Sequence, residues 1–331
     1  NILWYLGYEL PSRPVIWVAD FCDADRSITE GIREDIAETM ESGNLSSEAA
    51  IIPLRRGLCS DNFETQRAFA AKIAKKFRPA LVTWGARRIG FTDRLSINLV
   101  IEAAQTQAWT PMVAFESPYR ARISFGLESP VVLSLVKSRK EISSDILAFS
   151  RVVVASEMIK TARYRNAHAL LQHVQFPPET SEVDRLRLEL LRVVATYSSP
   201  SKVEAGAPPC GNAYYEETVE LVENILKKTR AVPPDSQAVI AWLKLYKALA
   251  EFDLVRGRPT REREIVRVKL VEGTLRELEA DFRKLGDVRG ELVTKISLAD
   301  NLPLDTRAAE AIEIWRSVFN SAEDSRVKWI A

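Results

Sequence analysis

Val15-Ile16-Trp17-Val18-Ala19-Asp20-Phe21, followed by a helical pattern from Ile28 to Met40, decides the fold of this 331-residue chain. The first stretch is apolar and β-branched, follows Pro14 and runs into an acidic cluster, which is typical of a buried strand. The second stretch spaces four apolar residues four positions apart, on one face of an amphipathic helix: Ile28, Ile32, Ile36 and Met40. A strand followed by a helix predicts the first half of an α/β unit.

The same alternation continues downstream. We expect a strand at Ala50 to Leu54, a helix at Phe63 to Phe77 and a strand at Ala80 to Trp84. This order predicts a three-layer α/β domain with a mostly parallel sheet and right-handed crossovers. Apolar and polar residues then alternate from Leu95 to Ile101, and Met112 to Phe115 is strand-like, which predicts an antiparallel meander that closes the sheet. The α/β domain is therefore expected to comprise residues 1–125.

Helical patterns dominate the remaining residues, 126–331. The expected helices cover residues 145–161, 165–174, 183–197, 214–230, 236–256, 261–285, 287–300 and 306–320. Arg151 to Ala155 is β-branched enough to fit either a helix or a strand, and no other strand is expected after Ser129. The Ser-, Pro- and Gly-rich segment near 198–213 predicts a mobile loop.

Two segments of the helical region resemble the tetratricopeptide repeat (TPR) family. The pattern Tyr164-x-x-Ala167-x-x-x-Leu171 is similar to that family's turn and second helix, and Leu278 to Asp287 is similar to its first helix and Gly-Asp turn. Upstream, Leu81-Val82-Thr83-Trp84-Gly85 with Leu95 to Ile101 resembles a small α/β module that precedes such repeats in some bacterial STAND-type signalling and regulatory proteins. The resemblance implies an array of helical hairpins that binds a protein partner in a bacterial signalling or defence pathway.

Composition limits the classes of function. The 46 Lys and Arg balance the 45 Asp and Glu, so no overall field attracts nucleic acid or an anionic membrane. The cysteines, Cys22, Cys59 and Cys210, are odd in number and far apart, which indicates a reducing compartment. No apolar run is long enough to span a bilayer, so we expect a cytoplasmic protein. The start at Asn1 suggests a piece of a longer chain with a domain upstream.

A phosphate-binding loop is the first candidate chemistry. Gly85 and Gly90 have the spacing of a Walker loop, but Phe91 occupies the place of its lysine and a strand follows, so we reject that site. Arg87 and Arg88 remain candidates for clamping an anion at the carboxyl end of a strand. A solvated turn is the simpler interpretation.

An acidic cluster follows the first predicted strand. Asp20, Asp23 and Asp25 lie where Mg²⁺-dependent phosphotransfer sites place carboxylates. Helix capping near Ser27 explains them more simply. If these residues share a cleft with Arg87 and Arg88, the domain is a ligand sensor or an enzyme acting on a phosphorylated small molecule.

The two histidines offer no catalytic arrangement. His168 and His173 lie five residues apart, so they do not share a helix face as a metal pair would. We interpret both as surface or packing residues. The sequence predicts no catalytic residue, no metal site and no cofactor.

A basic stretch offers an interaction surface. Residues 256–269 hold two acidic residues, Glu262 and Glu264, and six basic ones: Arg256, Arg258, Arg261, Arg263, Arg267 and Lys269. They fit an acidic protein partner, or a nucleic-acid backbone as the alternative, and an exposed Trp329 would mark a further interface. The sequence as a whole favours a non-enzymatic regulatory or scaffold protein that binds a partner protein through its helical region.

Overall fold

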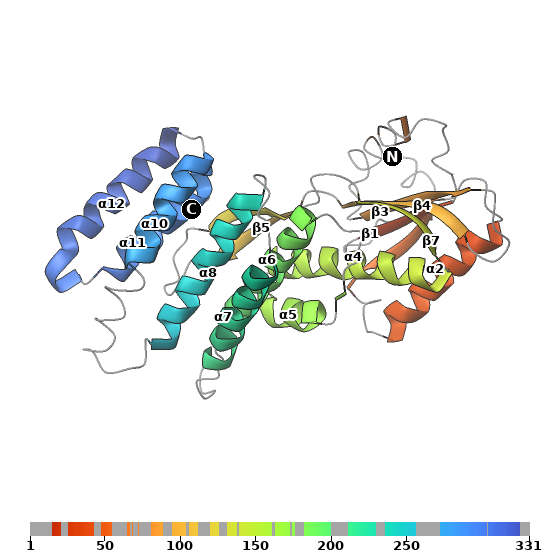
Figure 1. Cartoon of the computed structure of the whole chain (residues 1–331), viewed down its shortest axis with the longest axis horizontal. Coiled ribbons are helices and arrows are strands. Elements are labelled where there is room, and N and C mark those ends of the chain that lie inside the picture. The colour runs from red at the N-terminus through yellow and green to blue at the C-terminus, as the bar shows by residue number, and fades with distance from the viewer. Residues whose placement is uncertain are drawn as a thin grey trace, which may run out of the picture. The chain divides into compact units, whose positions relative to one another are not determined.

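The protein consists of two compact units in the computed structural model, in which helices predominate (Figure 1). The first unit takes its residues from Asn1–Thr106, Ser124–Thr161 and Ala169–Arg185, and the second from Gln107–Ile123, Ala162–His168 and Leu186–Ala331. The structure describes residues 15–20, 26–42, 48–54, 65, 66, 68, 72, 81–88, 95–103, 106–111, 120–125, 131–137, 139–160, 163–172, 174–175, 182–199, 211–229, 236–255, 272–302 and 304–324.

The first predicted strand and the helix that follows it are confirmed. Strand β1 (Val15–Ala19) is buried along its whole length, and helix α2 (Arg26–Ser42) buries Ile32, Ile36 and Met40. The guanidinium of Arg33 on α2 donates to the carbonyl of Val18 at 2.7 Å, which fixes the helix to the end of the strand. The apolar stripe therefore does what its spacing predicts.

Five strands form one mixed sheet in the order β2-β1-β3-β4-β7. Strands β2 (Ala50–Leu54) and β3 (Leu81–Arg88) lie parallel to β1, whereas β4 (Leu95–Ala103) is antiparallel to β3. The antiparallel strand predicted at residues 95–101 is thus present. Two of the four pairings are antiparallel, so the sheet is mixed and not mostly parallel. Strands β5 (Thr106–Pro111) and β6 (Arg120–Phe125) form a separate two-stranded sheet, and the strand predicted at 112–115 lies outside the described residues.

The sheet continues past residue 125, where the sequence predicted the α/β domain to end. Strand β7 (Val131–Lys137) pairs antiparallel with β4, and helix α4 (Arg139–Lys160) contacts α2 and the sheet. The prediction of no strand after Ser129 was therefore wrong.

Arg151 to Ala155 is part of α4, where its apolar side chains are buried. The described helices α2 and α4 lie on one face of the sheet (Figure 1), and the helix predicted at 63–77, which would supply a third layer, falls mostly outside the described residues.

Helices build the larger part of the second unit. Their bounds are α5 (Tyr164–Gln172) and α6 (Glu182–Ser198), both of which run across the division between the units, then α7 (Gly211–Lys228), α8 (Gln237–Val255), α10 (Gly273–Leu285), α11 (Val288–Asn301) and α12 (Leu304–Asp324). Of the loop predicted near 198–213, residues 200–210 lie outside the described residues and its ends belong to α6 and α7. Contacts join α7 to α8, α8 to α10, α10 to α11 and α11 to α12, so from α7 onward each described helix lies beside the next described one (Figure 1).

A buried polar contact joins the first helices of this unit. The Tyr197 hydroxyl on α6 donates to the Asp253 carboxylate on α8 at 2.9 Å, and the rings of Tyr215 and Tyr246 lie beside Tyr197. Burial, followed by the charge of Asp253, raises the pKa of Tyr197 well above its ordinary value. The phenol therefore stays protonated and remains a hydrogen-bond donor throughout the physiological range.

The turn between α10 and α11 follows its sequence signals. Gly286 adopts a left-handed conformation with φ of 67°, and the amide of Asp287 donates to the Phe282 carbonyl at 3.0 Å, which ends α10 in a Schellman motif. The Asp287 carboxylate then caps α11 by accepting from the amide of Gly290 at 2.9 Å, and also accepts from the Trp242 indole at 2.9 Å. One aspartate thus orients α11 and connects it to α8.

Candidate partner-binding surface on the C-terminal helices

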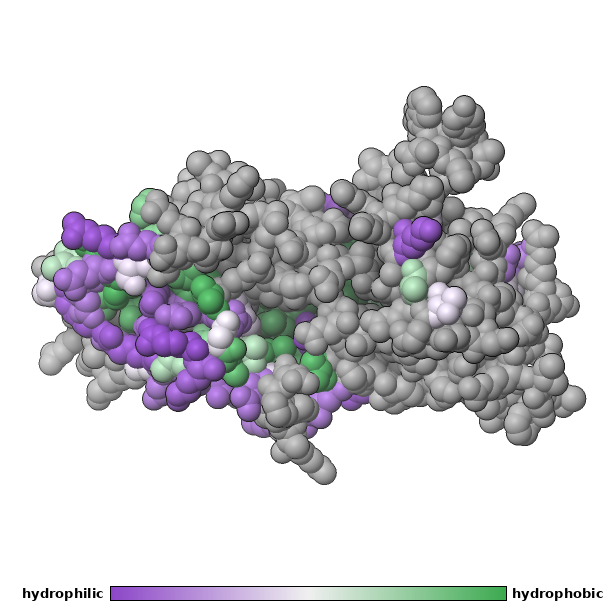
Figure 2. All heavy atoms as spheres, turned by 90° about the horizontal axis from the view of Figure 1, so that it is seen from above, coloured by the Kyte–Doolittle hydropathy of each residue, from purple (hydrophilic) through white to green (hydrophobic). Residues whose placement is uncertain are grey.

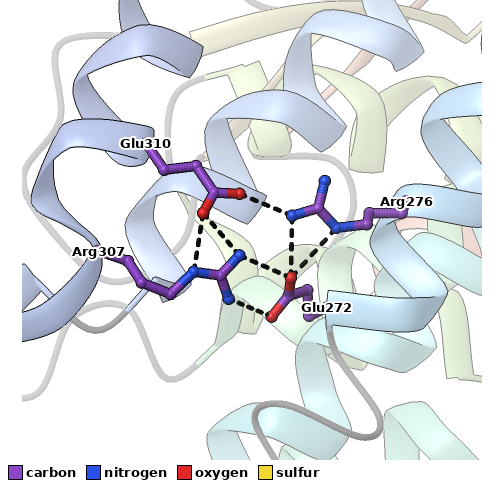
Figure 3. A network of polar contacts seen from close by, with 4 residues as sticks. All are labelled: Glu272, Arg276, Arg307 and Glu310. Carbon is purple, nitrogen blue, oxygen red and sulfur yellow. Dashed lines mark hydrogen bonds and ion pairs between the residues drawn. The ribbon is translucent and has the colours of Figure 1, made fainter.

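A closed ring of alternating charges connects the start of α10 to the start of α12 (Figure 3). Glu272, at the N-cap of α10, accepts from Arg307 of α12 in a bidentate contact at 2.6 and 3.0 Å and from Arg276 at 2.9 Å. Glu310 of α12 accepts from Arg307 at 2.8 Å and from Arg276 at 2.7 Å. We call these four residues the Arg–Glu ring.

The electrostatics of the Arg–Glu ring keep all four groups ionised. The hydrogen bond from Arg307, with a further one from Arg276, lowers the pKa of Glu272 to about 2. Hydrogen bonds from Arg276 and then Arg307 lower the pKa of Glu310. Networks of this kind contribute more than isolated surface pairs because each arginine is already oriented by two carboxylates. The ring therefore fixes the position of α12 relative to α10.

Apolar contacts fix the inner face of α12. Ala311 and Val318 are buried against α11, and Ile314 and Trp315 pack beside them. The clusters include Leu292, Ile296 and Ala299 of α11 and its C-cap residue Leu302. This side of α12 therefore packs against α11.

The opposite side of α12 is exposed and partly apolar. Ile312 and Phe319 expose 50% and 56% of their surface, and Ala309, Glu313 and Arg316 beside them are also exposed. We call these five residues the outer face of α12. Within the part of the chain that the structure describes, neither Glu313 nor Arg316 forms an ion pair. Figure 2 shows mainly hydrophilic residues over the C-terminal helices on the side that it views, with hydrophobic residues between them.

A buried histidine contact imitates a catalytic triad. His168 Nδ1 lies 3.0 Å from the Thr196 hydroxyl, and its Nε2 lies 3.5 Å from a Glu217 carboxylate oxygen. The three groups thus follow the order of a catalytic triad: hydroxyl, imidazole, carboxylate. Thr196, however, is completely buried and its hydroxyl donates to the Arg192 carbonyl. Desolvation by burial lowers the pKa of His168 despite the attraction of Glu217. His168 is thus a packing residue, as the sequence predicted, and this hydroxyl is not accessible to a substrate.

The predicted ligand-binding residues are only partly described. Asp20 follows β1 and pairs with Arg33 at 2.8 Å, so its carboxylate already has a cation partner. Arg87 and Arg88 lie within β3 itself, opposite Ile97 and Ser96 of β4, rather than in a turn. Asp23 and Asp25 lie outside the described residues, so their distance from the arginines stays untested.

The predicted partner-binding residues also lie outside the described part of the chain, namely Arg256, Arg258, Arg261, Arg263, Arg267, Lys269 and Trp329. The outer face of α12 was not predicted as a site. Its sequence signal is the pair of apolar residues Ile312 and Phe319, which lie seven positions apart. Each follows directly on another apolar residue that is buried. A helical-wheel plot of this segment shows apolar residues on two sides of the helix, but it does not show which side stays exposed.

Among the residues that the structure describes, no three His, Cys, Asp or Glu side chains gather where they could hold a metal ion. No described helix has the length and apolar character that crossing a bilayer requires. Comparison with protein-family models, curated proteins and solved structures finds no match.

Proposed function

We propose that this chain is a non-enzymatic regulatory or scaffold protein that recognises a partner protein through its C-terminal helices. The observation that carries this proposal is the outer face of α12, on which Ile312 and Phe319 are 50% and 56% exposed. On the inner face, Ala311 and Val318 are buried against α11. Apolar residues on one face of a rigid helix are the usual anchors of helix-mediated recognition. The resemblance to TPR arrays supports the same class of function.

Rigidity supports recognition by this surface. The Arg–Glu ring holds the start of α12, and the clusters around Trp315 hold its middle, so binding would not have to order the helix first. A preorganised surface loses less entropy on association than a flexible one. We therefore place partner recognition on α12.

Affinity capture from native extract, with quantitative mass spectrometry, tests this proposal. The double variant Ile312→Glu with Phe319→Glu should lose the proteins that the wild-type chain retains. Val288→Glu is the matched control, because Val288 is a similarly exposed apolar residue, at 48%, but belongs to α11. The proposal is wrong if the double variant and the control retain the same proteins as the wild type.

A further inference from the structure

The outer face of α12 is complementary to itself when two copies of the helix run antiparallel. We infer that this face pairs with α12 of a second copy of the chain, in a two-fold symmetric contact. The inference rests on the proposed function, since it names the partner for the same surface. It follows from the spacing, size and charge of the five outer-face residues.

The spacing of the face is that of a helix-pairing seam. Ala309, Ile312, Arg316 and Phe319 follow one another at intervals of three, four and three residues. This repeat keeps a single stripe in line with a neighbouring helix. A helix laid along the stripe would therefore contact all four positions.

Side-chain sizes fit an antiparallel register. With Ile312 level with the partner's Arg316, two-fold symmetry places Ala309 level with the partner's Phe319. The smallest side chain of the stripe then faces the largest one, and Ile312 lies against the aliphatic stem of an arginine. Two-fold symmetry repeats both the Ala309–Phe319 contact and the Ile312–Arg316 contact.

Charge favours the same register. Glu313 follows Ile312, so the guanidinium of the partner's Arg316 arrives beside the Glu313 carboxylate, and symmetry repeats the pair. A parallel arrangement in the same alignment would instead set Glu313 beside Glu313 and Arg316 beside Arg316, which is unfavourable. Because neither group pairs with another described residue, both are available for this contact.

The size of the face predicts a weak complex. Arg307 has non-helical backbone angles and kinks α12, so the regular helix that carries the outer face covers residues 308–324. It is about 26 Å long, and one face of it buries less than the roughly 800 Å² per partner of a standard stable interface. Association should therefore depend on protein concentration. Equilibrium between monomer and dimer, rather than a permanent dimer, is the expected state.

Sedimentation equilibrium of the full chain across a wide concentration range tests the inference. We expect a wild-type monomer–dimer equilibrium that Glu313→Arg or Arg316→Glu weakens at least tenfold. The combined swap Glu313→Arg with Arg316→Glu should restore dimerisation to within a few-fold, because the pairs re-form with their signs exchanged. Val288→Glu should dimerise as the wild type does. Circular dichroism of each variant checks that the fold is kept.

Three results would overturn the inference: a chain that stays monomeric at every concentration, a dimer insensitive to the single reversals, or a combined swap as weak as the singles. Its failure is distinguishable from that of the proposed function. If the chain is monomeric but Ile312→Glu with Phe319→Glu loses captured proteins, the second-copy inference fails and partner recognition stands. If neither property depends on the outer face, both fail.

Discussion

Gly290→Ala tests whether close approach of α10 and α11 holds the C-terminal hairpin together. A Cβ at Gly290 would lie 2.5 Å from Cγ of the Phe282 ring and nearer still to two other ring atoms, whereas ordinary contact begins near 3.4 Å. Phe282 is completely buried and packs against Trp242 with ring centroids 5.2 Å apart, so the ring has little room to move. The helices must therefore separate by roughly 1 Å, an overpacking strain that typically costs about 1–3 kcal/mol.

Helix propensity acts in the opposite direction. Replacing a helical glycine by alanine stabilises by up to about 1 kcal/mol where there is space for the methyl group. Gly273→Ala is the matched control, since a Cβ there meets nothing within 4 Å and the residue also belongs to a helix. We expect Gly273→Ala to be neutral or slightly stabilising and Gly290→Ala to destabilise by a net 1–2 kcal/mol, which lowers Tm by about 2–8 °C.

Thermal and urea unfolding followed by circular dichroism measures both variants. Combining Gly290→Ala with Phe282→Leu provides the decisive comparison, because a smaller side chain should relieve the clash. The double variant should be more stable than the sum of the two single losses predicts, by at least about 0.5 kcal/mol. Equal stability of Gly290→Ala and Gly273→Ala, or strict additivity with Phe282→Leu, would refute the reasoning.

Other contacts in the described helices give further predictions. Glu272→Gln should lower the free energy of unfolding at neutral pH, because it removes the carboxylate that faces Arg307. The difference from wild type should shrink between pH 4.5 and about 2, where the wild-type carboxylate itself becomes protonated. Urea unfolding across that pH range measures the difference. Asp287→Asn should keep the cap of α11 but lose the Trp242 hydrogen bond, costing about 1–2 kcal/mol by the same assay. Tyr197→Phe should cost roughly 1–3 kcal/mol, because it removes a donor from a buried carboxylate on α8; a melting temperature unchanged from wild type would contradict this.

The elements that were predicted correctly depend on signals between residues close together in the sequence. The stripe of Ile32, Ile36 and Met40 lies within one helix, and the pair Gly286 and Asp287 marks a helix end and a helix start by its own conformational preferences. Each of these features depends on residues within one or two turns. Tertiary contacts reinforced them and did not reverse them.

Strand β7 and helix α4 show where local signals fail. Val131–Lys137 is a strand because it pairs with β4, whose paired residues lie 30 to 42 positions earlier in the chain. The local sequence of neither strand identifies the other as its partner. Val152, Val153 and Val154 favour a strand locally, but their burial within α4 rewards helix formation. Long-range packing therefore overrode β-propensity here.

The candidate site was hidden for a related reason. Glu272 and Arg307 lie 35 residues apart, so nothing local identifies them as a pair. Ala311 and Ile312 are adjacent apolar residues, yet the first is buried and the second is half exposed. A sequence shows that a helix has apolar residues on two sides, but only the packed neighbours show which side is left open.

That open side needs a physical explanation. Single exposed apolar residues are ordinary on protein surfaces, whereas Ile312 and Phe319 align on one face of one helix, with opposite charges beside them. Neither residue belongs to the apolar clusters through which Ala311, Val318 and Trp315 contact α11. Polar replacements at these two positions would therefore leave the fold intact. A surface whose apolar character the fold does not require is best explained by binding, and its self-complementary charges identify a second α12 as the occupant.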